Sequence, residues 1–505
     1  MKKRICTISL SFFILSIAIQ SQTPDDKRGN FWLFGYTDGV FPPPPGFGVV
    51  KMDFNAPPLT VSDAQLNLSF SQTNASICDT DGDLLFFTNG IYIGKPNNEI
   101  MMNGDGLSPG IWTDAYAETG MIMAGGAVIL PVPDSDSLYV VIHGKLQIYE
   151  NPTLICMDKV YYSIVDMSLD NGEGAVTEKN VELVSDTLAV GDISVVRHGN
   201  GRDWWVMVPK YNSNIYYKIL LTPDGFQELQ AQGIDIPVKE GLGQSLFSPD
   251  GTRYARNELA GGIGVYDTVY VYDFDRCTGQ LSNLIHFAYA DSAFSGGVAF
   301  SPNSKLLHVP HYKHVFQFDL EAPDIFASMD TVATWDTFFS PFNTHFYLAS
   351  LAPDGKIYMN AVNGVNVLHV INNPNEKGEA CDIDQNGFQL PVYNATLPYL
   401  PNFRLGKWEG SPCDTIVLVS ATAPAFPLPE LTVYPNPASS FFVVNGQNVD
   451  FSLYDGTGRV VRRLPAINGE SKINLSGLAQ GIYFYKAEKN GRIVKNGKLI
   501  VERRD

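Results

Sequence analysis

Three histidines lie within seven residues, in the segment His308-Val-Pro-His311-Tyr-Lys-His314. Imidazole nitrogens are common ligands of zinc and other transition metals. Along an extended strand, however, residues three apart point to opposite faces, so one strand cannot direct His308 and His311 at the same ion. Only a turn could bring His314 back beside either of them. We therefore expect an ordinary β-hairpin here rather than a metal site.

Alternate carboxylates occur in Asp79-Thr-Asp81-Gly-Asp83, at a spacing that can hold calcium. The later bidentate glutamate of an EF-hand is missing, and Asp-Gly pairs are common in turns between strands. A second segment, Asp382 to Gly387, fits an EF-hand loop at its start but has Tyr393 at the last ligand position. The turn interpretation is favoured for both segments, and calcium is the one cofactor left open.

The sequence contains no Gly-x-Ser-x-Gly, His-Glu-x-x-His or phosphate-binding glycine-rich motif, so it indicates no catalytic residue. A carboxylate pair for glycoside hydrolysis need not be close in sequence, so its presence stays open. Three aromatic pairs could place one ring in the core and the other on a carbohydrate or peptide surface, although core and ordinary surface is the favoured interpretation. These pairs are Tyr161-Tyr162, Trp204-Trp205 and Tyr216-Tyr217.

The composition of the 505 residues favours many short strands joined by tight turns. Charged residues make up 17%, and 45 Gly and 32 Pro accompany abundant Tyr and Phe. The net charge is −18, which argues against non-specific binding to nucleic acid or to anionic membranes.

The N-terminus predicts export. Residues 1–21 begin with a basic Lys-Lys-Arg run followed by the uncharged apolar stretch Ile5 to Ile19, as in a secretory signal peptide. This stretch is short for a membrane span, and no later segment is long and apolar enough for one. We expect a chain without a membrane span that reaches the outside through the periplasm; an uncleaved anchor is the alternative.

Five cysteines remain after such cleavage, and an oxidising compartment permits one or two disulfides. We expect Cys381 to pair with Cys413, because both flank the last stretch before a proline-rich segment.

A degenerate repeat runs through residues 29–409. The segments ending at Pro249-Asp-Gly251, Pro302-Asn303 and Pro353-Asp-Gly355 each read as a short buried strand followed by a tight turn, and the prolines stand 53 and 51 residues apart. Second and third strands follow each turn, and the same order can be read upstream. Four antiparallel strands per unit indicate the blade of a β-propeller.

The pattern predicts six complete blades and one incomplete blade at the N-terminal end. Residues Asn30 to Leu68 supply a second, third and fourth strand without a first. We expect Leu400 to Gly406 to supply the missing inner strand and close a seven-bladed ring, which removes exposed sheet edges. Six or eight blades, or a stack of β-sandwiches, are the alternatives.

Several segments of this region resemble a family of secreted Bacteroidetes propellers, which are similar to WD-type and YVTN-type propellers only in fold. They include Asn30 to Gly35, Asp81 to Gly90, Met101 to Gly104, Tyr161 to Met167, His198 to Trp204 and Phe247 to Gly251. The resemblance implies a fold and an extracellular location, and carries no catalytic residue.

A linker, residues 410–429, precedes a small C-terminal module at 430–505. The linker is rich in proline and small residues. The module has seven short alternating segments, which predict an Ig-like β-sandwich. Its net charge is +4, whereas residues 22–429 carry −25. Opposite charges suggest two separate tasks.

The module resembles the type A C-terminal sorting domain of the type IX secretion system. The resemblance rests on Val433 to Pro437, Tyr454 to Arg459, Ile473 to Leu478, Gly481 to Phe484 and Lys498 to Val501. It implies recognition by the type IX machinery, passage through the outer membrane, and release or attachment at the cell surface. The motif residues that it singles out are Tyr434, Pro435, Asn436, Pro437, Gly458, Gly481, Tyr483 and Lys498. We expect the two prolines to fix the entry into the first strand, and Gly481 to mark a turn or a close approach.

The sequence thus predicts an all-β protein: a WD/YVTN-like seven-bladed propeller followed by a small Ig-like sandwich. The predicted function is that of a secreted or surface-displayed binding platform for an extracellular polysaccharide or protein. The alternatives are an extracellular hydrolase acting on polysaccharide, with its site in the propeller channel or on the loop face, and a purely structural role in the surface layer.

Overall fold

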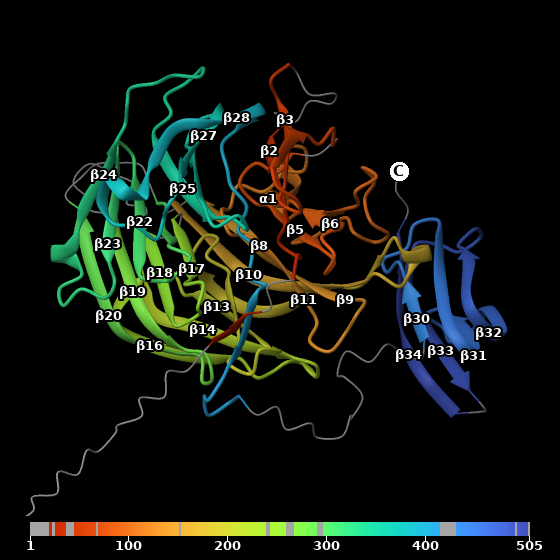
Figure 1. Cartoon of the computed structure of the whole chain (residues 1–505). Helices are drawn as coiled ribbons and strands as arrows, with labels where there is room; N and C mark the ends of the chain where they lie inside the picture. The colour runs from red at the N-terminus through yellow and green to blue at the C-terminus, as the bar shows by residue number, and fades with distance from the viewer. Residues whose placement is uncertain are drawn as a thin grey trace, which may run out of the picture.

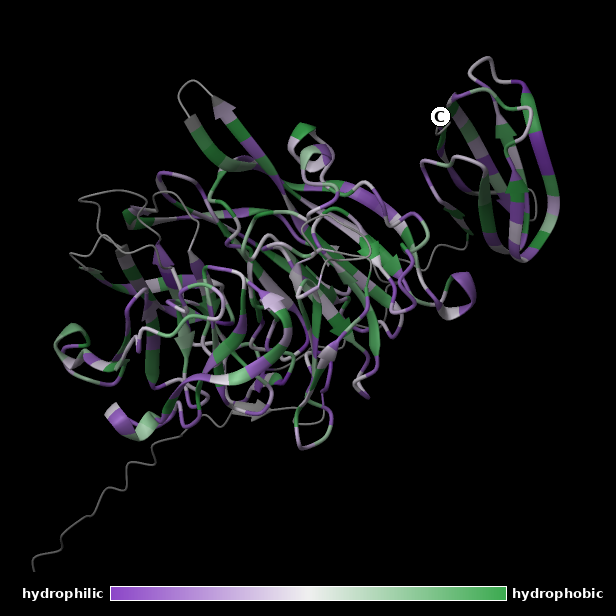
Figure 2. Ribbon diagram, turned by 90° about the horizontal axis from the view of Figure 1, so that it is seen from above, coloured by the Kyte–Doolittle hydropathy of each residue, from purple (hydrophilic) through white to green (hydrophobic). Residues whose placement is uncertain are grey.

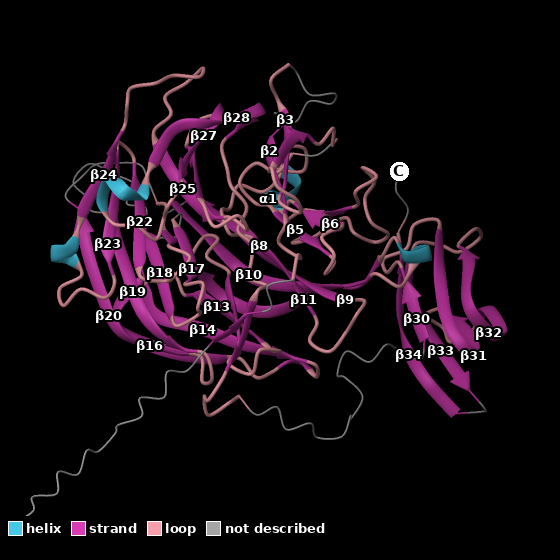
Figure 3. Cartoon of the chain, viewed as in Figure 1, coloured by secondary structure: helices cyan, strands magenta, loops and turns pink. Residues whose placement is uncertain are grey.

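The computed structural model is built almost entirely of β-strands (Figures 1 and 3). It describes residues 20–22, 26–36, 45–66, 69–150, 153–238, 243–258, 267–289, 296–414, 431–489 and 492–502. The short helices in these ranges are α1 (Ile111–Ala115), η1 (Asp170–Gly172), η2 (Phe326–Ser328) and η3 (Gly378–Cys381). Of the signal peptide expected at 1–21, residues 1–19 lie outside the described residues.

Seven antiparallel sheets follow one another along residues 31–394. The first two are three-stranded: β2 (Phe31–Tyr36), β3 (Gly48–Asp53) and β4 (Thr60–Asp63), then β5 (Ala75–Cys78), β6 (Leu84–Thr88) and β7 (Ile93–Gly94). The third has β8 (Ala127–Pro131), β9 (Leu138–Glu150), β10 (Thr153–Asp166) and β11 (Ala175–Leu188). The fourth has β12 (Ser194–Arg197), β13 (Trp204–Pro209), β14 (Ser213–Thr222), β15 (Gly225–Phe226) and β16 (Gln230–Val238).

The last three sheets are four-stranded meanders in chain order. The fifth contains β17 (Gln244–Phe247), β18 (Arg253–Glu258), β19 (Asp267–Asp275) and β20 (Gln280–Tyr289). The sixth contains β21 (Ala299–Phe300), β22 (Leu306–His311), β23 (His314–Asp319) and β24 (Asp330–Thr334). The seventh contains β25 (Phe346–Leu351), β26 (Ile357–Ala361), β27 (Val365–Ile371) and β28 (Ile383–Asn394).

The Pro-Asp-Gly turns join the first two strands of a sheet, as the repeat predicts. Between β17 and β18, the N–H of Gly251 donates to the carbonyl of Ser248 at 2.7 Å, and Gly251 has φ +71. Only glycine adopts this conformation without strain. The first strands are short and mostly buried, and those of five sheets, with Trp32 of β2, converge on one cavity. First strands meeting on a common centre are the arrangement of a propeller.

Two predictions about the ring are wrong. The described residues of the second sheet form three strands, not four, so the expected six complete blades reduce to five sheets of four or more strands. The segment Leu400 to Gly406 is not the inner strand of the first sheet. Instead β29 (Leu405–Trp408) pairs antiparallel with β1 (Gln20–Gln22), outside the seven sheets. The segment Leu400 to Gly406 therefore lies along the central cavity and is not a strand of any of the seven sheets.

The C-terminal module is a separate sheet beside the larger region (Figures 1 and 2). Its five strands are β30 (Leu431–Tyr434), β31 (Phe441–Tyr454), β32 (Val460–Asn474), β33 (Gly481–Lys489) and β34 (Arg492–Val501). Five strands, the short β30 and four long ones, thus replace the seven short strands that were expected. β31 reaches β30 with its first half and β33 with its second, and changes register with β32 at Gln447–Val449. This bending lets the strands enclose an apolar core of their own.

Candidate functional site

A cavity of about 310 Å³ lies where the first strands converge. Its wall combines these strands with the segment Pro398–Leu405, which we name the closing segment. The polar side chains of the wall are Asn30, Ser194, Arg197, Gln244, Ser245, Ser248, Ser350, Asn402 and Arg404, with Asp26 at one end. Cavities of this size, with a few polar groups among apolar ones, commonly bind small ligands.

Many of these polar groups are used to hold the closing segment. Ser350 Oγ donates to the carbonyl of Pro398 at 2.9 Å, and Asn402 Nδ2 donates to that of Pro249 at 2.8 Å. The Arg404 guanidinium donates to Asn30 Oδ1 at 3.0 Å and to the carbonyl of Pro353 at 3.1 Å. The cavity wall is thus fixed in place by contacts between distant parts of the chain.

The described wall of this cavity does not contain the pair of carboxylates that acid–base hydrolysis of a glycosidic bond requires. Among the described residues of its wall, Asp26 is the sole carboxylate, and its Oδ2 lies 2.7 Å from Nη1 of Arg28. Hydrolysis of a glycosidic bond needs two facing carboxyl groups, one as acid and one as base or nucleophile. The cavity as described supplies binding groups rather than a catalytic pair.

Beside the cavity, a cluster of charged and phenolic groups is buried between the fourth and fifth sheets. Arg256 Nε lies 2.8 Å from Asp192 Oδ2, and both side chains have no exposed surface. Tyr270 donates to Glu258 Oε2 at 2.9 Å. Burial raises the pKa of Asp192, and the adjacent Arg256 offsets part of this effect. Burial acts to lower the pKa of Arg256, but the two carboxylates outweigh it and keep the guanidinium charged.

The three aromatic pairs are buried or half-buried, as the favoured interpretation expects, and do not form the alternative aromatic surface. Trp204 and Trp205 are both buried; Arg197 covers the Trp204 ring at 4.1 Å, and Trp205 Nε1 donates to the carbonyl of Arg276. Tyr216 is buried, and Tyr217 Oη donates to Asp186 Oδ2 at 2.5 Å. Tyr161 and Tyr162 are half-buried on β10. These rings stabilise the sheets, in line with the favoured interpretation.

The three clustered histidines lie on β22 and β23 and do not form a metal site. The Nε2 of His308 is 2.9 Å from the carbonyl of Pro374, and burial lowers the pKa of His308 to about 4. Nδ1 of His314 lies 3.2 Å from Thr334 Oγ1 instead. His311 and His314 are directly paired neighbours of a tight hairpin, as expected.

The Asp79 segment is a turn closed by its own carboxylate. Asp79 Oδ1 accepts the N–H groups of Asp81, Gly82 and Asp83, each at 2.9 Å. Across the described ranges, no group of three His, Cys, Asp or Glu side chains has an arrangement that could hold a metal ion. Asp382 adopts φ +56 after η3, and the segment that follows it enters β28.

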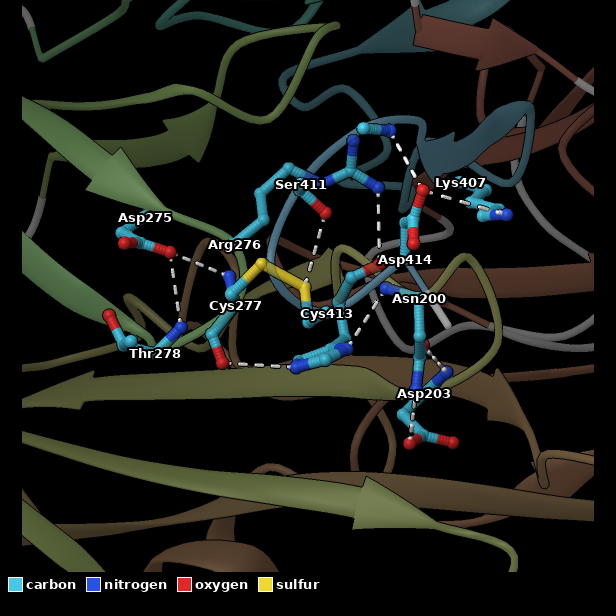
Figure 4. The surroundings of a disulfide bond; sticks show 12 residues. Asn200, Asp203, Asp275, Arg276, Cys277, Thr278, Lys407, Ser411, Cys413 and Asp414 are labelled. Atoms are coloured by element: carbon cyan, nitrogen blue, oxygen red, sulfur yellow. Dashed lines mark hydrogen bonds and ion pairs between the residues drawn. A yellow bond between two sulfur atoms is a disulfide. The ribbon is translucent and has the colours of Figure 1, made fainter. Parts of the chain in front are cut away.

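The disulfide joins Cys413 to Cys277, not to Cys381 (Figure 4). Cys277 lies in the turn after β19, 136 residues from its partner. Cys381 is fully buried in the seventh sheet's core, where burial raises its thiol pKa to about 11. Next to the bridge, Arg276 Nη2 donates to the carbonyl of Gly406 at 2.5 Å. Charge-assisted and covalent contacts together fasten the closing segment to the fifth sheet.

In the C-terminal module, Asn436 connects the segment after β30 to the edge of the last strand. Its Nδ2 donates to the carbonyl of Lys498, and its Oδ1 accepts the N–H of Ile500, both at 2.8 Å. Tyr434 is buried and donates to Glu470 Oε1 at 2.5 Å. Pro435 and Pro437 follow β30, so the expectation that they fix the entry into this strand is wrong; both peptide bonds before them are cis.

The other motif residues occupy turns and strand positions of the same sheet. Gly458, with φ +84, completes the Asp455 turn, which supports a hairpin of β31 and β32. Tyr483 is buried and donates to the carbonyl of Ala479, while Lys498 is exposed on β34. At Gly481 an added Cβ would meet no atom within 4 Å, so the expected close approach is not present; its φ of +154 is the feature that favours glycine.

Sequence reasoning missed one surface feature, the loop between β24 and β25. We name Trp335–His345 the aromatic hairpin; it projects at the top of Figure 1. Phe338, Phe339 and Phe342 in this loop are 44%, 58% and 56% exposed. Four aromatic residues within eight positions were the available signal, in a segment with no strand periodicity.

The comparisons with known proteins identify the C-terminal module. Together, the converging first strands define a propeller-type region, followed by a small β-module. Residues 432–502 of that module match the family model described as the secretion system C-terminal sorting domain. The chain therefore carries a type IX sorting domain, which directs secretion to the cell surface or the extracellular space. No helix among the described residues has the length and apolar character needed to cross a membrane.

A search of curated proteins gave no match. Among solved structures, a protein from Lactobacillus plantarum is 13% identical, with 89% of this chain and 100% of that chain covered and a TM-score of 0.34. The Dos1 propeller is 12% identical, with coverages of 74% and 88% and a TM-score of 0.38. A putative 6-phosphogluconolactonase from Bacteroides fragilis is 11% identical, with coverages of 74% and 98% and a TM-score of 0.36. With TM-scores below 0.5, none of these likenesses carries an argument about this chain.

Proposed function

We propose that this protein is an extracellular binding protein, in which a seven-bladed propeller at 29–409 is exported by a sorting domain at 430–505. The observation that carries the export step is the match of residues 432–502 to the sorting-domain family. The seven successive sheets support seven blades, although the first two are short. The bent five-stranded module, with its own apolar core, supports an Ig-like domain joined by a linker at 410–429.

Binding is favoured over hydrolysis by the composition of the central cavity. Its wall offers arginine, amide and hydroxyl groups, but the single described carboxylate is paired with Arg28. A hydrolase would need a second, facing carboxylate. The propeller thus acts as a platform for an extracellular polysaccharide or protein, either released or attached at the surface.

The sorting motif lies at the β34 edge of the sheet, where Asn436 hydrogen-bonds to the last strand. Its contacts with Lys498 and Ile500 keep the segment Tyr434–Pro437 against β34, close to the exposed Lys498 side chain. We propose that the type IX machinery reads this edge. The signal peptide at 1–21 brings the chain to the periplasm first.

A secretion experiment tests the export step. A chain that ends at residue 429 should fold and accumulate in the periplasm, because the large core clusters of the propeller lie outside the deleted module. The deletion uncovers one small apolar contact, in which Leu169 and Ala175 pack against Tyr434 and Val443. The matched control replaces Ile111, an exposed residue of the propeller, by Ala in the full chain. Cell fractions and medium are compared by immunoblotting. The truncated chain in the medium at the level of the control would overturn the assignment.

A binding experiment tests the platform. The full chain is applied to arrays of polysaccharides and of extracellular proteins, and both retention and new reducing ends are recorded. Retention without cleavage supports the proposal. New reducing ends would favour the hydrolase, and retention on neither array would contradict the binding function.

A further inference from the structure

The aromatic hairpin, Trp335–His345, presents three phenylalanine rings to solvent. Large contiguous apolar patches are rare on the surface of monomeric proteins and commonly mark binding sites. Taking about 200 Å² for a fully exposed phenylalanine, the rings of Phe338, Phe339 and Phe342 expose roughly 300 Å² together. The patch lies on loops that connect the sixth and seventh sheets.

The rings are held in place by a compact, hydrogen-bonded loop. The N–H of Ser340 donates to the carbonyl of Phe342 at 2.9 Å, and Phe339 forms a bridge with Asn343. The loop is tied to the next sheet, because Ser340 Oγ donates to Asn366 Oδ1 at 2.6 Å and Asn363 Nδ2 donates to the carbonyl of Asn343 at 3.1 Å. A ligand would therefore meet a preorganised surface and order few groups on binding.

A stack of rings supports the exposed ones from below. Phe339 contacts Trp335, with ring centroids 5.8 Å apart, and Trp335 contacts His345 at 4.0 Å. His345 in turn stacks on Tyr312 at 3.9 Å, and its side chain is buried. The interior of the hairpin is thus already filled with aromatic groups, which leaves the outer phenylalanines facing water.

The area and the rim of the patch indicate what covers it. A stable protein interface buries about 800 Å² on each partner, well above the exposed ring area here. Polar side chains adjoin the rings: Ser340 Oγ donates to Asn366 Oδ1 at 2.6 Å, and Gln389 Nε2 donates to the carbonyl of Asn366 at 2.8 Å. The only carboxylate of the loop, Asp336, accepts Asn386 Nδ2 at 3.0 Å. Sugar rings match such a surface, since they offer apolar C–H faces to rings and hydroxyls to a polar rim.

We propose that the aromatic hairpin is a stacking site for a neutral polysaccharide, which rests on the binding function proposed above. Neutral chains are favoured over anionic ones because residues 22–429 carry a net charge of −25. Successive sugar units lie on Phe339 and Phe342, and the rim of the patch hydrogen-bonds their hydroxyls. The central cavity is not part of this site.

Two assays with the full chain test the proposal. One measures retention on insoluble cellulose and chitin, and the other measures mobility shifts in gels that contain xylan, β-glucan or starch. The double variant Phe339→Ala/Phe342→Ala should lose at least about tenfold in affinity for the polymer that the wild type binds, which is about 1.4 kcal/mol, because both apolar stacking surfaces are removed. Phe339→Trp/Phe342→Trp should retain binding. The matched control is Phe326→Ala, which removes a phenylalanine 48% exposed in η2, at another loop. Unchanged melting temperatures establish that each variant is folded.

Two outcomes would overturn the proposal in distinguishable ways. Equal affinity of the double alanine variant and the wild type would place the polysaccharide site elsewhere and leave the binding function intact. A wild type that binds none of the neutral polymers, yet binds extracellular proteins or an anionic polysaccharide, would exclude a neutral polysaccharide as the ligand of the patch. Loss of that other ligand in the double alanine variant would assign it to the patch. A wild type that binds nothing on any array would contradict the proposed function as well.

Discussion

The propeller region and the sorting domain are built by different physical means. Among the described residues, the propeller buries Lys95, Asp192, Lys218, Arg256 and Arg276, whereas the buried polar residues of the sorting domain are Thr432 and Ser452. The sorting domain has an apolar core of its own and contains neither histidine nor cysteine. Buried charged groups thus help to position the sheets of the propeller relative to one another. The single sheet of the sorting domain is held together by hydrophobic packing. The comparison teaches that the two modules respond to different stresses.

The largest effect should follow removal of the buried cation between the fourth and fifth sheets. Arg256→Leu leaves Asp192 and Glu258 buried without their partner, which costs about 3–5 kcal/mol. Calorimetry of the full chain should then show a lower transition for the propeller and an unchanged one for the sorting domain. The control is Arg253→Leu, an arginine on the same strand that is partly exposed. Equal effects of both variants would remove the special role of the buried cluster.

Loss of the disulfide should come next. Cys413→Ser opens a 136-residue loop and should destabilise the propeller by about 2–4 kcal/mol. The thiol of Cys277 should then react with iodoacetamide in the native protein. Cys381→Ser is the control, because this buried cysteine is unpaired and its replacement keeps the bridge. If Cys381→Ser instead released a reactive thiol, the Cys277–Cys413 pairing would be wrong.

Acidification should have an effect of intermediate size. It should lower the free energy of unfolding of the propeller and leave that of the sorting domain unchanged. Burial lowers the pKa of His143 to about 3 and those of His308 and His369 to about 4, so these imidazoles stay neutral in the folded state. The unfolded chain takes up protons below about pH 6.5 and is favoured there. Stability of the propeller should therefore fall by about 1 kcal/mol per histidine between pH 6.5 and 5.5.

The same decline should continue down to about pH 4, where His308 and His369 also bind protons in the folded state. The sorting domain lacks histidine and should be unaffected between pH 6.5 and 5.5. Urea unfolding at several pH values measures both transitions. His314→Asn, a substitution at a half-buried histidine of the β22–β23 hairpin, serves as the control. A pH-independent propeller transition would contradict the buried neutral state.

The smallest effect belongs to the sorting domain. Asn436→Ala removes two hydrogen bonds to β34 and should lower only the stability of this domain, by about 1–2 kcal/mol. Asn496→Ala, at an exposed position of the same strand, should have little effect. If both variants behaved alike, Asn436 would not hold the edge of the sheet. Secretion of the two variants, compared at 20 °C where both remain folded, then reports recognition separately from stability.

Local features of the fold were predictable from sequence, and long-range ones were not. The turn at Pro249–Gly251 and the strand β8 could be placed because their signals lie within a few residues. The partner of Cys413 depends on contacts 136 residues away, and the position of β29 depends on β1 at the other end of the chain. Neither leaves a periodic signal.

The aromatic hairpin was the part of the molecule that the sequence predicted least well. Phe339 packs against Trp335, which in turn contacts His345, and this arrangement leaves the Phe339 ring 58% exposed, which is a property of packing. A sequence reader assigns such rings to a core by default. The sorting motif was recognisable, but its mechanics were not, since the prolines follow β30 and Asn436 reaches across to β34.

The bridge between Cys277 and Cys413 also determines how the molecule carries mechanical load. In the export step proposed above, the machinery holds the C-terminal module, so tension reaches the propeller through the chain that follows Cys413. Without the bridge, that tension would fall on single non-covalent contacts of the segment that contains β29, such as the hydrogen bond from Arg276 to the carbonyl of Gly406. With it, the load passes through sulfur into the turn beside β19, whose neighbours must shear together. Pulling single molecules from the C-terminus should therefore require a larger force in the oxidised protein than in the reduced one.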